Sequence, residues 1–253
     1  MFTTSPPHVT SYSHDALVNI LQEAIQALAQ YLPTALPLYR RLQYRHFSSQ
    51  SYLLVSSTSN PSNGIAAEGV LQNARAIAFV DRDQRPETEV WMFGVWEARA
   101  EDEVLSEHWM DDAADHVKAL LKKIRDIGLP TTDGHSSTVV AIYPISTVHP
   151  HGTPSAPPAP VAWAFLGLDA SLTTLHVEPE YRGRGLAKLV TLKLFSDEMD
   201  AFGGEEGAVS QGKRWAHADV QEGNVASYRV MESVGARWSW ETYWLKVDVD
   251  KAG

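Results

Sequence analysis

The sequence has no cysteine, which excludes disulfides, thiolate catalysis and cysteine-ligated zinc sites. It also has no apolar stretch long enough to cross a membrane as a helix. Basic residues are scarce: 21 Lys and Arg against 31 Asp and Glu give a formal net charge of −10, and such a chain binds nucleic acid and anionic membranes poorly. Residues 1–13 hold neither an apolar run nor an arginine, so we expect no targeting signal and a cytoplasmic protein.

Hydrophobic residues make up 44% of the 253 positions, enough for one large domain or two small ones. We expect an N-terminal α/β lobe over residues 1–130 and a second α/β domain over residues 131–253. In the first, residues 1–12 are expected to be a loose lead-in, followed by a helix that Ser13 caps and Pro33 stops. The other elements expected in this lobe are strands at Tyr52–Ser56, Ala76–Val80 and Val90–Trp96 and a helix at Glu107–Ile127.

The second half alternates strands and helices around one Pro-rich segment. His149–Pro160 cannot pair as a strand because of its prolines, so we interpret it as a solvated hairpin tip. His149 and His151 lie there without a third ligand, which argues against a metal site. The other elements predicted here are strands at Thr138–Tyr143, Val161–Leu168 and Arg214–Val220, a helix at Asn224–Val234 ended by Gly235, and closing strands over Trp238–Val249.

One basic stretch stands out against this acidic background. A strand that includes Leu175–Val177 ends at Pro179, which has no N–H for the ladder, and Gly183 and Gly185 then allow a tight turn into a helix. The apolar positions of that helix are predicted to share one face: Leu186, Leu189, Val190 and Leu194, with the stem of Lys193. A strand, a glycine turn and a helix in this order direct several backbone N–H groups at one spot.

Such a spot holds phosphate oxygens, because it lies at the positive end of a helix dipole. Arg182, Arg184 and Lys188 add fixed positive charge there. Neither of the two common phosphate-loop patterns, G-x-x-x-x-G-K-[ST] and G-x-G-x-x-G, is present. The pattern Arg182-x-x-Gly185-x-Ala187, after a strand and a proline, instead resembles the pyrophosphate signature of the GNAT superfamily of CoA-dependent acyltransferases.

The resemblance extends over residues 138–249. Pro160-Val-Ala-Trp163, the turn itself and Asn224-Val-Ala-Ser227 followed by Gly235 look like the glycine N-acyltransferase-like branch. It implies a GNAT fold, a mixed central sheet flanked by helices. The first half is similar in the order of its elements to the N-terminal lobe of that branch, and a degenerate GNAT-like half is one interpretation of it.

The resemblance implies an N-acyltransferase that moves an acetyl or other short acyl group from acyl-CoA to a primary amine. The acceptor would be a small molecule or an amino acid, attacking the thioester directly and without a metal. A backbone N–H near Val177 would meet the thioester carbonyl. The residues implied in acyl-CoA binding are Leu175, Val177, Arg182, Gly183, Arg184, Gly185, Leu186, Ala187, Asn224 and Ser227.

The proton acceptor is where the chain departs from the family. Many members carry a glutamate as general base at the position of Ser171, and a tyrosine as general acid at the position of Met231, one turn after Tyr228 here. A serine cannot keep a proton at neutral pH. The candidate acceptors are His217 with Asp219, which alternation places on one face of a strand, then His176 and Asp169.

Two other functions stay open at this point. A serine in place of the glutamate base and a methionine in place of the tyrosine acid, at Ser171 and Met231, are compatible with a CoA-binding or regulatory module that has little or no turnover. A protein or peptide N-acetyltransferase is a variant of the first hypothesis, since an acidic surface favours basic acceptors. Release of CoA thiol in the presence of amines separates the enzyme from the binding module.

Overall fold

The computed structural model describes residues 6–58, 71–83, 89–98, 107–127, 138–142, 160–202 and 215–242. They divide into two units, which are described separately below. Unit 1 comprises Met1–His135 with Trp240–Gly253, and unit 2 comprises Ser136–Ser239. The sequence had suggested a division between residues 130 and 131, with the second domain running to the end of the chain. Each unit has an antiparallel sheet flanked by helices, which confirms the α/β class.

Unit 1 is built on a four-stranded antiparallel sheet with the strands in chain order. Its strands are β1 (His8–Ser13), β2 (Ser51–Ser57), β3 (Ala74–Asp81) and β4 (Glu89–Gly94). The first strand corrects the expectation of a loose lead-in over residues 1–12, because β1 pairs with β2 along its whole length. Val9, Thr10 and Tyr12 are residues that favour strands, and they outweigh the prolines just before them.

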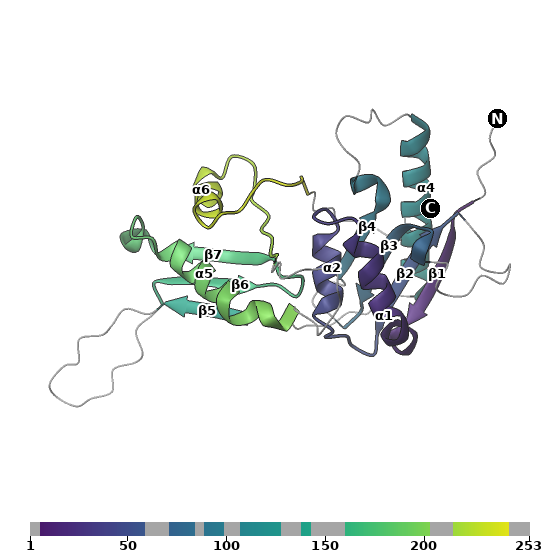
Figure 1. Cartoon of the computed structure of the whole chain (residues 1–253), viewed down its shortest axis with the longest axis horizontal. Helices are drawn as coiled ribbons and strands as arrows, with labels where there is room; N and C mark the ends of the chain where they lie inside the picture. Colours follow the sequence, from purple (N-terminus) through teal and green to yellow (C-terminus); the bar gives the residue numbers. More distant parts are fainter. Residues whose placement is uncertain are drawn as a thin grey trace. The chain divides into compact units, whose positions relative to one another are not determined.

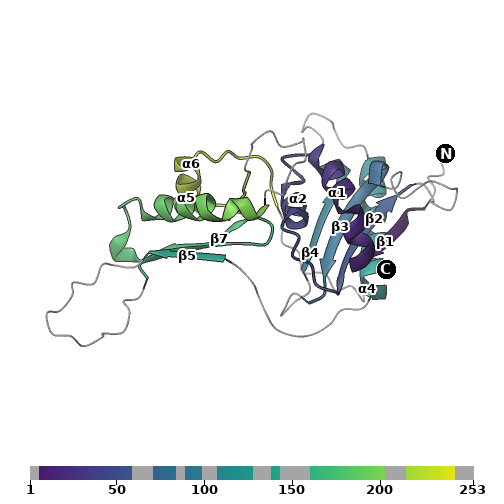
Figure 2. The same ribbon diagram turned by 60° about the horizontal axis from the view of Figure 1, so that its bottom comes forward.

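Helices cover both faces of this sheet (Figures 1 and 2). The helices that can be described in full in unit 1 are α1 (His14–Ala29), α2 (Leu36–Gln43), the one-turn η2 (Val95–Ala98) and α4 (Glu107–Ile127). On the α4 face, Leu120 and Ile124 pack against a buried group that includes Leu54 and Ala78. Leu53, which precedes Leu54 in β2, is opposite Phe79 and faces the side of the sheet away from α4, as strand alternation requires.

The short helix α2 was not predicted, and it places a fully buried arginine in the core. Arg41 lies with its Nη2 3.4 Å from Oδ2 of Asp81, and both side chains are 0% exposed. The guanidinium centre lies over two aromatic rings, 4.5 Å from the centroid of Phe79 and 4.9 Å from that of Trp91. This ion pair therefore fastens α2 to the end of β3.

Unit 2 holds a three-stranded antiparallel sheet with α5 across it (Figure 1). Its elements are β5 (Thr138–Ile142), β6 (Ala162–Leu166), β7 (Leu172–Val177), the one-turn η3 (Pro179–Tyr181), α5 (Leu186–Glu198), the one-turn η4 (Met199–Phe202) and α6 (Val225–Ser233). Ala162, Ala164 and Leu166 of β6 are buried, whereas Trp163 and Phe165 between them are half-buried. The buried set faces α5, since alternate residues of a strand point to opposite faces.

Two expectations for unit 2 need correction. The buried face of α5 is Val190, Thr191 and Leu194, while Leu189 is 57% exposed, so the apolar stripe is rotated from the predicted one. Residues 215–220 form no strand; they make one isolated parallel bridge, from His217 to Ser171. The described residues 236–242 are not in a strand either, and the rest of the predicted closing strands lies outside the described residues, as does His149–Pro160 except Pro160.

Candidate functional site

The turn between β7 and α5 has the backbone that the sequence predicted. Gly183 and Gly185 adopt left-handed conformations, with φ of 73° and 78°. A Cβ added at either glycine would meet no other atom of the chain within 4 Å. The conformation favours glycine there, and the space beside both residues leaves their backbone open to close approach by another molecule.

The two arginines of the turn are held in place by backbone carbonyls. Nε of Arg182 donates to the carbonyl oxygen of Val177 at 3.0 Å, which ties the turn to the end of β7. Nη2 of Arg184 donates to the carbonyl oxygen of Glu180 at 3.1 Å, and its guanidinium lies 5.3 Å from the centroid of the Tyr181 ring. Both side chains remain exposed, so their charge is positioned and accessible at once.

The first turn of α5 concentrates positive potential beside these arginines. Gly185 is the N-cap and contributes no side-chain hydrogen bond, and the first turn holds no acidic residue. The first N–H groups of a helix have no intrahelical partner and carry its positive pole. Lys188, exposed in the same turn, adds a like charge to that pole. An arrangement of this kind is unfavourable by itself and is stabilised by a bound anion. Leu186 and Ala187, which open the helix, are half-buried.

Strand β7 contains a bulge upstream of the turn. Trp163 is opposite His176 and Phe165 is opposite Thr173, so one residue of β6, Ala164, lies against two residues of β7, Thr174 and Leu175. Thr174 takes up the extra length with a left-handed φ of 49°. A bulge leaves a residue out of the ladder and bends its strand, and bulges are frequent beside active sites. The bulge lies just before Leu175, and Leu175 and Val177 are both half-buried.

Asn224 and Ser227 have a local structural role. Oδ1 of Asn224 accepts a hydrogen bond from the backbone N–H of Ser227 at 3.1 Å, which caps α6. Substituting such a cap typically costs about 1 kcal/mol. The expected helix with Asn at its start and Gly235 at its end, with φ of 87°, is confirmed. Whether these two residues also contact acyl-CoA stays a prediction.

The structure brings His217 to Asp169, a different carboxylate from the one expected. Nε2 of His217 lies 3.7 Å from Oδ2 of Asp169, and their side chains are 6% and 13% exposed. Oδ1 of Asp169 accepts hydrogen bonds from the Ser171 hydroxyl at 2.5 Å and from the Ser171 backbone N–H at 3.1 Å. Asp219, which the sequence had paired with His217, is exposed. The pairing with Asp169 depends on the bridge between residues far apart in the chain.

The third candidate, His176, lies on the sheet surface. Its ring stacks on Trp163 with centroids 4.4 Å apart, and its Nε2 is 3.7 Å from Oε2 of Glu178. The side chains of His176 and Glu178 are 39% and 38% exposed. His176 and His217 are therefore two distinct candidates, one exposed and paired with Glu178, the other buried and paired with Asp169.

Unit 1 has polar features that the sequence did not reveal. Oγ of Ser56 lies 2.6 Å from Nδ1 of His116, whose Nε2 is 3.6 Å from Oδ1 of Asp112. Ser56 of β2 and His116 of α4 are fully buried between that helix and the sheet, so no substrate reaches them. Burial lowers the pKa of His116 below its ordinary value, and the attraction of Asp112 opposes that shift. The group fixes α4 on the sheet.

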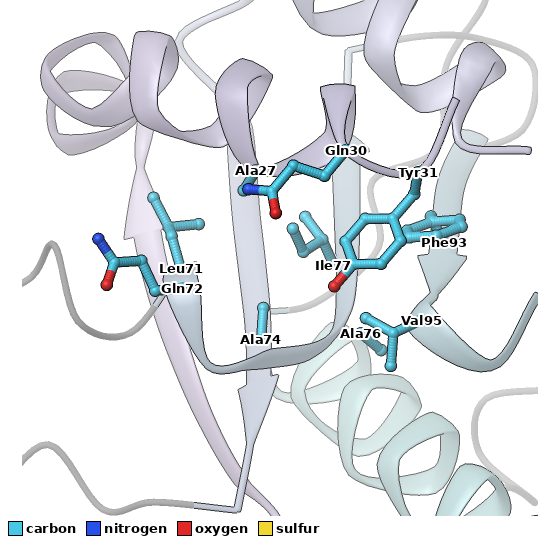
Figure 3. A pocket seen from close by; sticks show the side chains of 10 residues that line it. All are labelled: Ala27, Gln30, Tyr31, Leu71, Gln72, Ala74, Ala76, Ile77, Phe93 and Val95. Atoms are coloured by element: carbon cyan, nitrogen blue, oxygen red, sulfur yellow. The ribbon is translucent and has the colours of Figure 1, made fainter. Parts of the chain in front are cut away.

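Unit 1 also contains a small pocket between the end of α1 and the sheet (Figure 3). The Tyr31 ring lies beside Phe93, with centroids 5.3 Å apart, and its hydroxyl points toward the middle of the lining side chains. The polar side chains of Gln30 and Gln72 are also part of the lining, and none of the ten lining residues is charged. The pocket offers no group suited to phosphate.

One comparison with known proteins shows the family to which the chain belongs. The family described as the N-terminal domain of the acyl-CoA N-acyltransferase verG matches residues 8–184, so the chain belongs to this family. The match covers unit 1 from His8 to His135 and unit 2 as far as Arg184, and it includes Asp169, Ser171 and His176 but not His217. Acyl-CoA N-acyl transfer is therefore the chemistry of the family, with acyl-CoA as donor.

The other comparisons add little. A solved X-ray structure of a Drosophila protein is similar over 92% of this chain and 95% of its own, with 11% identity and a TM-score of 0.49. No curated protein matches the chain significantly. Within the described ranges, no group of three His, Cys, Asp or Glu side chains could hold a metal ion. Among the described helices, none has both the length and the apolar character that crossing a bilayer requires.

Proposed function

We propose that the protein transfers an acetyl or other short acyl group from acyl-CoA to the primary amine of a small molecule or an amino acid. The observation that carries this proposal is the turn from Arg182 to Lys188. Two left-handed glycines with open space beside them, an N-terminal helical turn without a side-chain cap and three exposed basic residues converge there. These are the features that bind a pyrophosphate.

Strand β7 supplies a path for the pantetheine arm. From Leu172 to Val177 the strand covers about 17 Å at about 3.3 Å per residue. His217 pairs with the beginning of this strand, and the described residues 218–220 do not continue the ladder. Among the described residues, none pairs with this edge of β7 beyond Leu172, and in our proposal an extended ligand hydrogen-bonds there. A backbone N–H at the bulge would bind the thioester oxygen as it becomes an oxyanion.

The reaction needs proximity more than it needs special chemistry, because a thioester is already activated. The amine nitrogen attacks the thioester carbon, a C–N bond forms, and the C–S bond then breaks with its electron pair leaving on sulfur. The nitrogen must lose one proton on the way. Of the candidates from the sequence, the pair of His217 and Asp169 is our choice for the groups that finally hold this proton, and His176 beside Glu178 is the second.

The acceptor class follows from charge and from the family resemblance. A formal net charge of −10 attracts basic amines over long distances. The glycine N-acyltransferase-like motifs favour a small amine or amino acid over a protein. A catalytically weak CoA-binding module is the second candidate function, and the absence of a carboxylate at Ser171 itself is the observation that favours it.

Calorimetric titration of acetyl-CoA into Gly185→Val tests the site. A valine there places methyl groups where the phosphates must approach the backbone, so we expect the Kd to rise at least about tenfold, equivalent to about 1.4 kcal/mol. Gly235→Val is the matched control, because Gly235 is also left-handed and open but lies at the far end of α6. It bears the same backbone strain and should bind acetyl-CoA as the parent does. Equal affinity in all three proteins would refute the assignment.

A further inference from the structure

We infer that Ser171 is the catalytic residue that takes the proton from the acceptor amine. Asp169 and His217 are positioning residues, and Ser171 passes the proton on to them. This inference rests on the proposed function and specifies its proton path. By resemblance, Ser171 occupies the position at which many GNAT members carry a glutamate. The side chain of Asp169, two residues upstream, hydrogen-bonds to Ser171 and thus places a carboxylate beside that position.

The three side chains form a continuous chain of polar contacts. The Ser171 hydroxyl donates to Oδ1 of Asp169 at 2.5 Å, and the other oxygen of the same carboxylate lies 3.7 Å from Nε2 of His217. Because the serine proton points at Asp169, the lone pairs of its oxygen are left to accept a hydrogen bond from a bound amine. A serine alone cannot keep a proton, but a serine bonded to a carboxylate can pass one on.

Exposure decreases along this chain of contacts. Ser171 is half-buried, whereas the side chains of Asp169 and His217 are 13% and 6% exposed. A substrate on the surface therefore reaches the hydroxyl first, and the two ionisable groups lie behind it.

The backbone holds this group rigidly. Gly167 and Ser171 close the β6–β7 turn, with the Gly167 N–H donating to the Ser171 carbonyl oxygen at 2.8 Å. A Cβ at Gly167 would come within 2.4 Å of Oγ of Ser171 and 2.8 Å of Oδ1 of Asp169, so both side chains are folded tightly over the turn. Ala170, between them, has a left-handed φ of 62°. Such geometry fixes the serine–aspartate pair without help from a ligand.

The group also lies at the correct end of the proposed acyl-CoA site. The Leu172 N–H donates to the carbonyl oxygen of His217 at 2.8 Å, at the beginning of β7, while Arg182 follows the end of the same strand. If the pyrophosphate binds at the turn, the pantetheine arm runs back along β7 and brings the thioester to the bulge at Thr174. Ser171 is three residues upstream of that bulge.

The proposed step balances. The amine nitrogen bonds to the thioester carbon, and the carbonyl electron pair moves to oxygen. The nitrogen proton passes to Oγ of Ser171 while the serine's own proton passes to Oδ1 of Asp169. When the oxyanion re-forms the carbonyl, the C–S bond breaks and CoA leaves as a thiolate. The proton held between Asp169 and His217 is then released to solvent, which restores the resting state.

The test compares Asp169→Asn and Ser171→Ala with the parent in a thiol-release assay over a range of pH. Asparagine keeps an oxygen for the Ser171 backbone N–H, so the turn is preserved while the charge is lost. We expect kcat to fall at least about tenfold near neutral pH in both variants. The loss should shrink at high pH, where the free amine is already deprotonated, and acetyl-CoA affinity should stay unchanged.

Two further variants make the result specific. Asp197→Asn removes a carboxylate that pairs with Lys193 on the exposed side of α5, and it should keep the parent rate. Asp219→Asn removes the carboxylate that the sequence had favoured, and it should lose much less activity than Asp169→Asn. A parent-like pH profile in Asp169→Asn, or an equal loss in Asp219→Asn, would overturn the inference.

A second readout does not depend on activity. The ring nitrogen signals of His217 in an NMR spectrum should differ between Asp169→Asn and the parent at the same pH, because the Asp169 carboxylate lies 3.7 Å from Nε2 of His217. Unchanged His217 signals would disprove the coupling even in an active enzyme. If the signals change but the parent releases no thiol with any amine, the proposed function fails instead and the proton path fails with it.

Discussion

The hydroxyl of Ser171 donates a 2.5 Å hydrogen bond to Oδ1 of Asp169. This contact changes the interpretation of the serine, which stands where the resemblance to GNAT acyltransferases implies a glutamate. The sequence shows a missing base, whereas the structure shows a carboxylate within reach of the same place. The distinction separates an active acyltransferase from a CoA-binding module, because a proton acceptor is the part that the second function does not need.

The buried ion pair of unit 1 should dominate the stability of that unit. Asp81→Asn leaves Arg41 charged, 0% exposed and without its carboxylate, a change that typically costs about 3–5 kcal/mol. Arg41→Met with Asp81→Asn removes both charges and should recover part of the loss. Chemical denaturation of the three proteins measures the difference. A single variant as stable as the parent would show that this pair does not fasten α2 to the sheet.

The Asp81 carboxyl of this pair also predicts how the stability of unit 1 changes in acid. Burial alone would raise the pKa of the Asp81 carboxyl, but hydrogen bonds from Ser48, Asp83 and Ser51 hold it below its ordinary value. The folded state therefore releases the proton more readily than the unfolded chain. The resulting stabilisation is present above the ordinary pKa of an aspartate and is lost as pH falls through the folded value. Asp81→Asn should show a smaller loss of stability below about pH 4 than the parent.

His116 should respond to acid in a different range. Burial lowers its pKa, so the folded state binds the proton less readily than the unfolded chain and stability falls as pH drops below about 6.5. His116→Gln removes this contribution. Its free energy of unfolding should decline less than the parent's between about pH 7 and pH 5, measured by urea denaturation. His46→Gln, at an exposed position, is the control and should decline as the parent does.

Local pattern was sufficient for the elements with a clear period or a clear boundary. The helix Glu107–Ile127 was predicted with the bounds observed, and β2 and β3 within two residues at each end. The strand His8–Ser13 was missed because its polar residues hide the pattern. The strand predicted over residues 214–220 is wrong for the described residues 215–220, because alternation in the sequence does not show that only His217 bridges to the beginning of β7.

In the candidate site, too, the local features could be predicted and the contacts between distant segments could not. The glycine turn and the cap at Asn224 are local, so their residues could be named from spacing alone. The pairing of His217 with Asp169 joins segments 48 residues apart and requires the bridge between Ser171 and His217. Alternation pointed to Asp219 instead, since neighbours in sequence are all that a pattern can compare. The buried Arg41–Asp81 pair escaped prediction for the same reason.

The most direct test of the central claim is product analysis. The parent protein is incubated with acetyl-CoA and a mixture of primary amines and amino acids, and the products are identified by mass spectrometry while free thiol is measured. We predict an amine that gains an acetyl group, with one equivalent of CoA thiol released for each acylated molecule and almost none without amine. Binding of acetyl-CoA with no acylated amine above the protein-free background would contradict the account and leave only a CoA-binding module.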